Sequence, residues 1–136
     1  MTTVDPERLG LSDAWIEGDP SARWRSAAAL GPGNGADETG ASLLEVDPGC
    51  RLARHTDSAE ETIVVLEGRA EVEVDDNGEL VERSGIALVP AYEPHSVGNA
   101  GEERLRFLAF YSSAEVVTTY ETPVEPDGDR VRSPVA

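Results

Sequence analysis

Residues 49–68 read GCRLARHTDSAEETIVVLEG, and this stretch decides the fold prediction. It sets His55, Asp57 and Glu61 between two glycines, and the segment that follows Glu61 is short and rich in β-branched residues. Such a pattern is typical of a strand bounded by turns. Residues two apart on a strand share a face, so His55 and Asp57 point the same way and Glu61 falls on the next strand.

A second stretch, SGIALVPAYEPHSVGN at 84–99, carries the other histidine of the chain, His95. Imidazole is the commonest protein ligand for transition metals. If the two strand pairs face each other across a barrel, His95 meets His55, Asp57 and Glu61. Two imidazoles with one or two carboxylates suit a divalent first-row ion such as Mn, Fe, Co, Ni or Zn.

The rest of the chain also favours strands. Residues 70–74 alternate apolar and acidic side chains, and Asn77-Gly78 before the next alternating segment is a strong hairpin signal. Residues 22–30 suit a strand or a short helix, and no segment shows helical periodicity over three turns. Many short strands with glycine at the turns predict an all-β sandwich or barrel.

Together the two stretches resemble the motifs of the cupin family. Gly49, His55, Asp57, Glu61 and Gly68 match the spacing of its first motif, with Asp57 in place of a second histidine. Pro90, His95 and Asn99 match its second motif, where Tyr92 replaces a glycine and Gly85 falls one place late. The resemblance implies a six-to-eight-stranded double-stranded β-helix, or jelly-roll barrel.

The resemblance also implies that His55, Asp57, Glu61 and His95 bind a divalent metal: Mn, Fe, Ni or Zn. Asp57 could reach the metal directly or through water, or fall short and leave two histidines and one carboxylate. Glu61 is a candidate general base, and Tyr92 the nearest candidate proton donor. A barrel that has lost its metal is the alternative, and Asp57 is one sign of such a loss.

We expect one domain, with an N-terminal arm at 1–21, the barrel at 22–121 and a mobile, proline-rich tail at 122–136. The apolar segments 22–30 and 41–46 could pair with a second copy of the chain, because an uncovered sheet edge invites association. The sequence therefore predicts a homodimer.

Charge narrows the classes of partner. Twenty-seven acids against eleven bases give a net charge of −16, and every base is an arginine. Nucleic acids and anionic membranes are excluded as partners because no basic stripe exists, and the absence of lysine excludes Schiff-base chemistry. No signal segment or long apolar run is present, so we expect a soluble cytoplasmic protein. A high-salt cytoplasm and a GC-rich genome would each explain the acidity.

Two functions stay open at this stage. The first is a metal-dependent enzyme acting on a small organic molecule, of dioxygenase, isomerase or cyclase type. The alternative is a barrel that binds a small ligand without catalysis, or a structural barrel with a degenerate metal site. Metal content separates the two, because only the first requires an ion with open positions.

Overall fold

The computed structural model covers residues 1–136 and consists almost entirely of β-strands, as predicted. Two 3-10 turns, η1 (Pro6–Arg8) and η2 (Pro32–Asn34), are the only helical segments. The twelve strands are β1 (Ser12–Ile16), β2 (Asp19–Leu30), β3 (Gly40–Val46), β4 (Arg51–Asp57), β5 (Glu61–Glu67), β6 (Ala70–Val74), β7 (Asn77–Val81), β8 (Ile86–Val89), β9 (His95–Asn99), β10 (Leu105–Tyr111), β11 (Thr118–Val124) and β12 (Asp129–Arg132).

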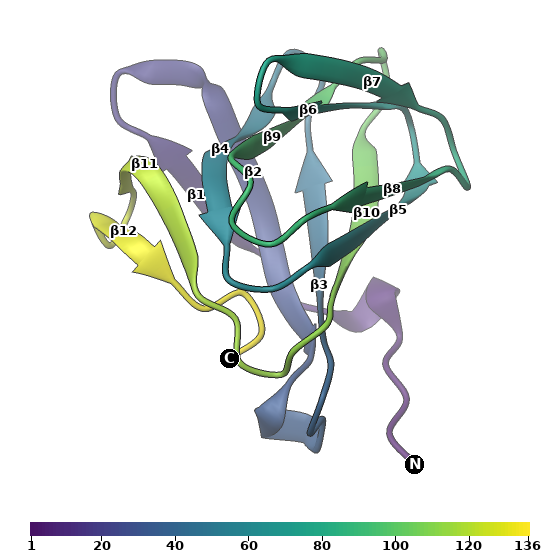
Figure 1. Ribbon diagram of the computed structural model, residues 1–136. Coiled ribbons are helices and arrows are strands. Elements are labelled where there is room, and N and C mark those ends of the chain that lie inside the picture. Colours follow the sequence, from purple (N-terminus) through teal and green to yellow (C-terminus); the bar gives the residue numbers. More distant parts are fainter.

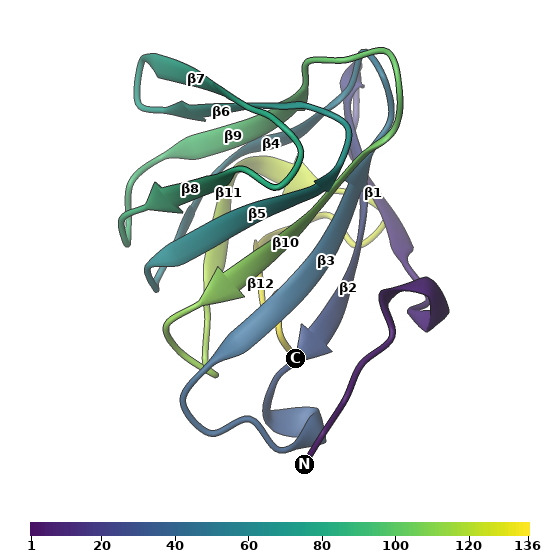
Figure 2. The same ribbon diagram turned by 90° about the vertical axis from the view of Figure 1, so that its right-hand side faces the viewer.

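The strands form one strongly curled sheet in the order β7-β6-β9-β4-β2-β3-β10-β5-β8 (Figures 1 and 2). We call β7, β6, β9 and β4, extended by β11 and β12, the β4 layer. We call β3, β10, β5 and β8 the β5 layer. Strand β2 lies between the two layers, and β1 pairs with it. The two layers face each other across the interior, which is the arrangement of a jelly-roll barrel.

Strand β2 joins the two layers by unequal contacts. It pairs with β3 over its second half, from Arg25 to Leu30, but its parallel pairing with β4 is limited to Ala22 and Arg51. Beyond Arg51, β4 runs between β9 and β11 instead. The barrel wall is therefore weakest between the second half of β2 and the end of β4, and the interior is reached at that point.

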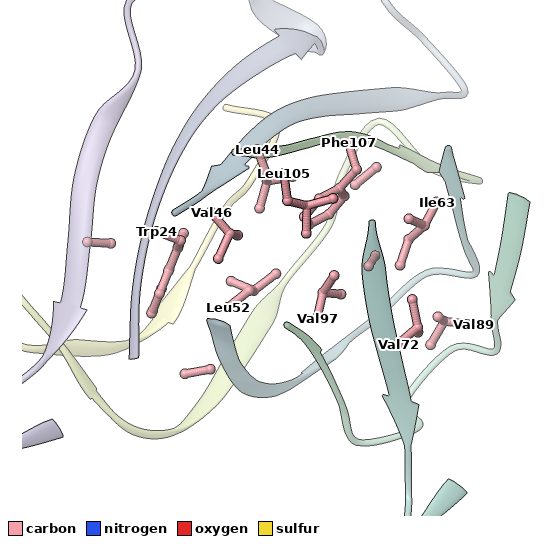
Figure 3. Close-up of a cluster of buried hydrophobic side chains, with 14 of the residues drawn as sticks. Trp24, Leu44, Val46, Leu52, Ile63, Val72, Val89, Val97, Leu105 and Phe107 are labelled. Atoms are coloured by element: carbon pink, nitrogen blue, oxygen red, sulfur yellow. The ribbon is translucent and has the colours of Figure 1, made fainter. Parts of the chain in front are cut away.

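The core fills the space between the layers, and Figure 3 shows its larger side chains. Alternation along the strands places them there: Ile63 and Val65 of β5 are fully buried with Glu61 on the same face, as the pattern predicts. Phe107 of β10 belongs to this cluster and is fully buried. Because β3 pairs on both sides and is buried along its whole length, residues 41–46 offer no free edge to a second copy.

The hairpin after β6 differs in detail from the prediction. Val74 pairs with Asn77, so the two turn residues are Asp75 and Asp76 rather than Asn77-Gly78. Asp75 adopts a φ of 54°, a left-handed conformation that aspartate tolerates better than most residues. Asn77 and Gly78 instead begin β7.

Both ends of the chain are built into the fold. Residues 1–21 include η1 and β1, and Glu7 there accepts a hydrogen bond of 2.6 Å from Arg106 of β10. Residues 122–136 include the end of β11 and all of β12, and Val135 is buried. The sequence predicts an arm at 1–21 and a mobile tail at 122–136, and the structure places strands in both segments.

Two predictions concern assembly and environment. No helix in the structure combines the length and the apolar character that a bilayer crossing requires. The homodimer stays a prediction, and a mass near 14.5 kDa in light scattering would contradict it.

Candidate metal centre

The two histidines lie side by side on neighbouring strands. His55 of β4 is the direct antiparallel partner of His95 of β9, and their ring centroids are 4.2 Å apart. The two histidines therefore meet within one layer, not across the barrel as the sequence suggested. Facing residues on paired strands point the same way, so both imidazoles enter the interior together.

Backbone carbonyls fix the orientation of both rings. His55 Nδ1 lies 2.6 Å from the carbonyl oxygen of Ala53, and His95 Nδ1 lies 2.9 Å from that of Glu93. A carbonyl can only accept, so each Nδ1 carries the hydrogen and donates it. This leaves both Nε2 atoms directed into the site, which is the arrangement that metal-ligating histidines show.

Asp57 closes the cluster from the end of β4. Its Oδ1 accepts a hydrogen bond of 2.5 Å from the Thr118 hydroxyl. Its Oδ2 is buried, receives no hydrogen bond, and lies 3.5 Å from His55 Nε2 and 3.3 Å from His95 Nε2. His55, Asp57 and His95 are thus three buried residues whose ligand atoms could hold a metal ion.

Glu61 reaches the same region from the opposite layer. It begins β5, and its Oε1 lies 3.0 Å from His95 Nε2. Its side chain is 3% exposed. The structure therefore brings together all four residues that the sequence predicted as ligands, with Glu61 adjoining the other three through His95.

Burial and charge act together on these groups. Burial works to lower the pKa of His95, but the nearby carboxyl groups of Asp57 and Glu61 raise it to about 10. Burial works to raise the pKa of Asp57, yet both imidazoles and Thr118 hold it well below its usual range. Burial raises the pKa of Glu61, partly offset by His95. Without a metal, a protonated His95 balances the negative charge of Asp57, and a bound metal ion would replace that proton.

A cavity of about 390 Å³ connects this cluster to the surface at the weak part of the barrel wall. Its size is in the range of small-molecule pockets. The floor includes His55 and Glu61, and the mouth lies between the start of β1, the second half of β2 and the segment after β12. Its lining also includes Trp24, Ser42, Leu44, Tyr111, Thr118, Tyr120 and Arg132.

Aromatic rings line one side of the cavity. Tyr120 faces His55 across the β4–β11 pairing, with ring centroids 5.0 Å apart, and Trp24 stacks on Tyr120 at 5.4 Å. Burial and the charge of Asp57 raise the pKa of the Tyr120 hydroxyl, whereas the positive charge of Arg132 opposes that rise. Tyr111, opposite Glu61 on β10, is buried and its pKa is raised for similar reasons. Both hydroxyls are therefore neutral hydrogen-bonding groups at ordinary pH.

Tyr92 lies apart from this arrangement. Its side chain is 69% exposed and does not line the cavity, and only its backbone N–H contacts the site, donating 2.8 Å to the Asp57 carbonyl. Its φ of 64° marks the position where the family's motif has glycine. Tyr111 and Tyr120 are the tyrosines that reach the cavity, and sequence reasoning assigned no role to Tyr120 or Thr118.

The chain belongs to the cupin family. A family profile described as "Cupin domain" matches residues 42–111, just over half of the chain and the part that holds all four candidate ligands. No curated protein sequence matches this chain. The double-stranded β-helix predicted from the two motifs is thereby confirmed.

Solved structures agree with this assignment. The polyketide cyclase RemF from Streptomyces resistomycificus has a TM-score of 0.65 and 25% identity, covering 82% of this chain and 78% of the cyclase. A putative sugar phosphate isomerase from Acidithiobacillus ferrooxidans has a TM-score of 0.65 and 22% identity, covering 84% and 75%. Lactobacillus farciminis oxalate decarboxylase has a TM-score of 0.69 and 18% identity, covering 78% and 33%. The chain thus spans about a third of the decarboxylase.

Proposed function

We propose that the protein is a mononuclear, divalent-metal-dependent enzyme that acts on a small organic molecule in the cavity between β2 and the end of β4. The single observation that carries the proposal is Asp57 Oδ2. It is buried without a hydrogen-bond donor, between two imidazole Nε2 atoms that are both directed at it. A buried carboxylate oxygen without a partner is costly, and a metal ion would satisfy it.

The spacing of the ligand atoms fits one ion. Ligands about 2.0–2.2 Å from the same ion, in tetrahedral or octahedral arrangement, lie about 3.0–3.5 Å from each other. His55 Nε2 and His95 Nε2 are 3.5 and 3.3 Å from Asp57 Oδ2, and Glu61 Oε1 is 3.0 Å from His95 Nε2. His55, Asp57 and His95 would hold the ion, and Glu61 would be a fourth ligand or a neighbouring base.

The donor set also limits the metal. Two nitrogens and one or two carboxylate oxygens suit Mn, Fe, Ni or Zn, whereas copper(I) prefers sulfur ligands. The only cysteine, Cys50, is not among the residues that could hold the ion. A bound ion of this kind polarises an oxygen atom of a substrate or of water.

The residues around the ligands have separate tasks. Thr118 holds Asp57 in place through Oδ1, so that Oδ2 faces the imidazoles. Trp24 and Tyr120 offer stacked aromatic surface to the apolar part of a substrate. Tyr111 and Tyr120 offer neutral hydroxyl groups, and the buried carboxyl group of Glu61 is the candidate to take up or deliver a proton.

The similarity to a polyketide cyclase of about the same length supports small-molecule chemistry of the isomerase or cyclase type. Dioxygenase chemistry would use the same ligand set, because two histidines and a carboxylate are also the ligands of non-haem iron oxygenases. Turnover of oxygen-bearing aromatic substrates under air and under nitrogen distinguishes the two, since only the oxygenase consumes dioxygen.

Metal analysis by mass spectrometry on protein purified without an affinity tag tests the proposal. About one transition-metal ion per chain is expected, and His95→Ala should lose it. The matched control is Ser96→Ala on the same strand, which lies outside the cluster and should retain the ion. No ion in the wild-type protein, even after incubation with Mn, Fe, Ni and Zn, would overturn the proposal and leave a ligand-binding or structural barrel.

A further inference from the structure

We infer that Arg132 is the substrate-recognition residue of this cavity, and that it selects molecules carrying a carboxylate group. The inference rests on the proposed function, because it assumes that a substrate oxygen occupies the metal-binding end of the same cavity. Arg132 is the last residue of β12 and the only arginine among the residues that line the cavity.

Strand pairing directs Arg132 toward the site. Arg132 is the antiparallel partner of Thr118, and paired residues project from the same face of a sheet. Thr118 points inward, because its hydroxyl donates a hydrogen bond to Asp57. The guanidinium therefore lies one strand away from the ligand cluster, on the cavity side, and its charge is felt at the neighbouring Tyr120 hydroxyl.

The guanidinium of Arg132 is not committed to a partner within the protein. Its Nη1 atom is buried and makes no hydrogen bond. The closest carboxylate oxygen within ion-pair range belongs to Asp127 and is 3.9 Å away, too far for a hydrogen bond. The side chain is 30% exposed, so an incoming molecule can reach it.

Every other arginine that is buried or half-buried has a carboxylate oxygen within 3.0 Å, and only exposed arginines, such as Arg83, lack one. Arg51, Arg69 and Arg106 each have a carboxylate oxygen within 2.6–2.7 Å. With 27 acids for 11 arginines, a carboxylate partner is abundant in this chain. A half-buried arginine that faces the cavity without one is arranged for a partner from outside.

The charge of the cavity explains why a cation is needed there. A divalent ion held by two carboxylates would leave the floor without net charge, and the protein as a whole carries −16. An anionic substrate would therefore be repelled unless the cavity supplied its own positive charge. A single guanidinium matches a carboxylate monoanion through two parallel hydrogen bonds, whereas a phosphate dianion would call for further donors.

The substrate class follows from the two ends of the cavity. Its carboxylate would pair with Arg132, a hydroxyl or keto oxygen would face the cluster of His55, Asp57 and His95, and its apolar part would lie on Trp24 and Tyr120. Hydroxy acids and keto acids with an aromatic or aliphatic body have this distribution of groups.

Isothermal titration calorimetry with three acid and amide pairs tests the inference: lactate with lactamide, mandelate with mandelamide, and salicylate with salicylamide. At least one acid is expected to bind the wild-type protein tenfold or more tightly than its amide. Arg132→Gln should abolish that preference. Arg132→Lys should retain only part of it, because lysine keeps the charge but cannot form the two parallel hydrogen bonds of a guanidinium.

Two controls make the result decisive. Arg83→Gln removes the same charge from an exposed residue that has no ion pair and lies outside the cavity, and it should leave the preference unchanged. Metal content is measured on every sample, and each titration is run with and without metal, since the guanidinium pair does not depend on the ion.

The outcomes of the two tests are distinguishable. Absence of metal from all variants counts against the proposed function alone, because the acid preference is still read on metal-free protein. An acid preference that is missing in the wild type, or that survives in Arg132→Gln, overturns the inference. Tighter binding of inorganic phosphate than of every acid would overturn the assignment to carboxylates.

Discussion

Thr118 and Asp57 are direct cross-strand partners and are also joined by a side-chain hydrogen bond of 2.5 Å between Oγ1 and Oδ1. The bond occupies one oxygen of the carboxylate and turns the other toward the two imidazoles. Only the first three residues of β11 pair with β4, and they pair with its last three. This contact therefore ties the C-terminal hairpin to the candidate metal centre.

Thr118→Val should weaken metal binding without removing a ligand. Valine has nearly the same shape but cannot donate to Asp57, and loss of a group that orients a ligand lowers metal affinity about 10- to 100-fold. Competition with a chromophoric chelator measures the change. Thr119→Val, one residue further along β11 and half-buried, is the matched control and should bind as the wild type does. Equal affinity in the two variants would contradict the role of Thr118.

Local pattern was enough to find the candidate ligands. His55 and Asp57 share a strand, Ile63 and Val65 share the inward face of Glu61, and both motifs are short enough to be recognised in the printed sequence. Each of these relations depends on residues a few positions apart, where strand periodicity holds.

The surroundings of the ligands could not be predicted in the same way. Thr118, Tyr120 and Arg132 enter the site only because β11 pairs with β4 and β12 pairs with β11. The pattern of residues 118–132 does not predict which strand of the barrel this segment will pair with. The turn at Asp75-Asp76 was missed for a different reason: Asn-Gly is the stronger turn signal, but the pairing of Val74 with Asn77 sets the register.

Phe107→Ala should destabilise the barrel by about 3–5 kcal/mol, because it leaves a large cavity in the core. Phe107 is fully buried within the cluster shown in Figure 3. Phe110 lies on the same strand with its side chain on the outer face and is 38% exposed, so Phe110→Ala serves as the control and should cost far less. Urea denaturation followed by circular dichroism compares them, and similar losses would contradict the assignment of the two faces.

The Arg25–Asp47 pair should make stability depend on pH in the acid range. Asp47 accepts a hydrogen bond of 2.9 Å from Arg25, and this bond holds the pKa of Asp47 below its usual range. A lowered pKa in the folded protein gives stability that is complete above pH ~3.8 and is lost as pH falls through the folded value. Because Asp47 is half-exposed, its contribution at pH 7 is only about 0.5–1 kcal/mol.

Asp47→Asn should therefore lower the unfolding free energy at pH 7 and have no effect near pH 2. Thermal or urea unfolding across this range gives the difference between variant and wild type. Asp37→Asn removes the same charge from an exposed residue without an ion pair and should show a flat difference. A difference for Asp47→Asn that persists unchanged at pH 2 would exclude the ion pair as its cause.

The segment after β12 packs closely against two glycines, Gly31 and Gly40, beside the cavity mouth. Val135 is buried, and the Ser42 hydroxyl donates a hydrogen bond of 2.6 Å to the carbonyl of Pro134. A Cβ atom at Gly31 would overlap the Val135 carbonyl oxygen, and one at Gly40 would come within 2.7 Å of the Val135 side chain. Close packing of these backbones requires the absence of side chains.

Gly31→Ala should therefore displace residues 133–136 from the barrel, because the new Cβ atom would overlap the Val135 carbonyl oxygen. Overpacking of this kind costs about 1–3 kcal/mol, and the freed segment should exchange its amide hydrogens faster in mass spectrometry. Gly33→Ala is the control, because a Cβ atom there meets nothing within 4 Å. Because Ser133 and Pro134 line the cavity, the displaced segment should also widen its mouth and weaken the binding of any acid that Arg132 recognises. Protection of residues 133–136 that is the same in both variants would show that this segment is not held by Gly31.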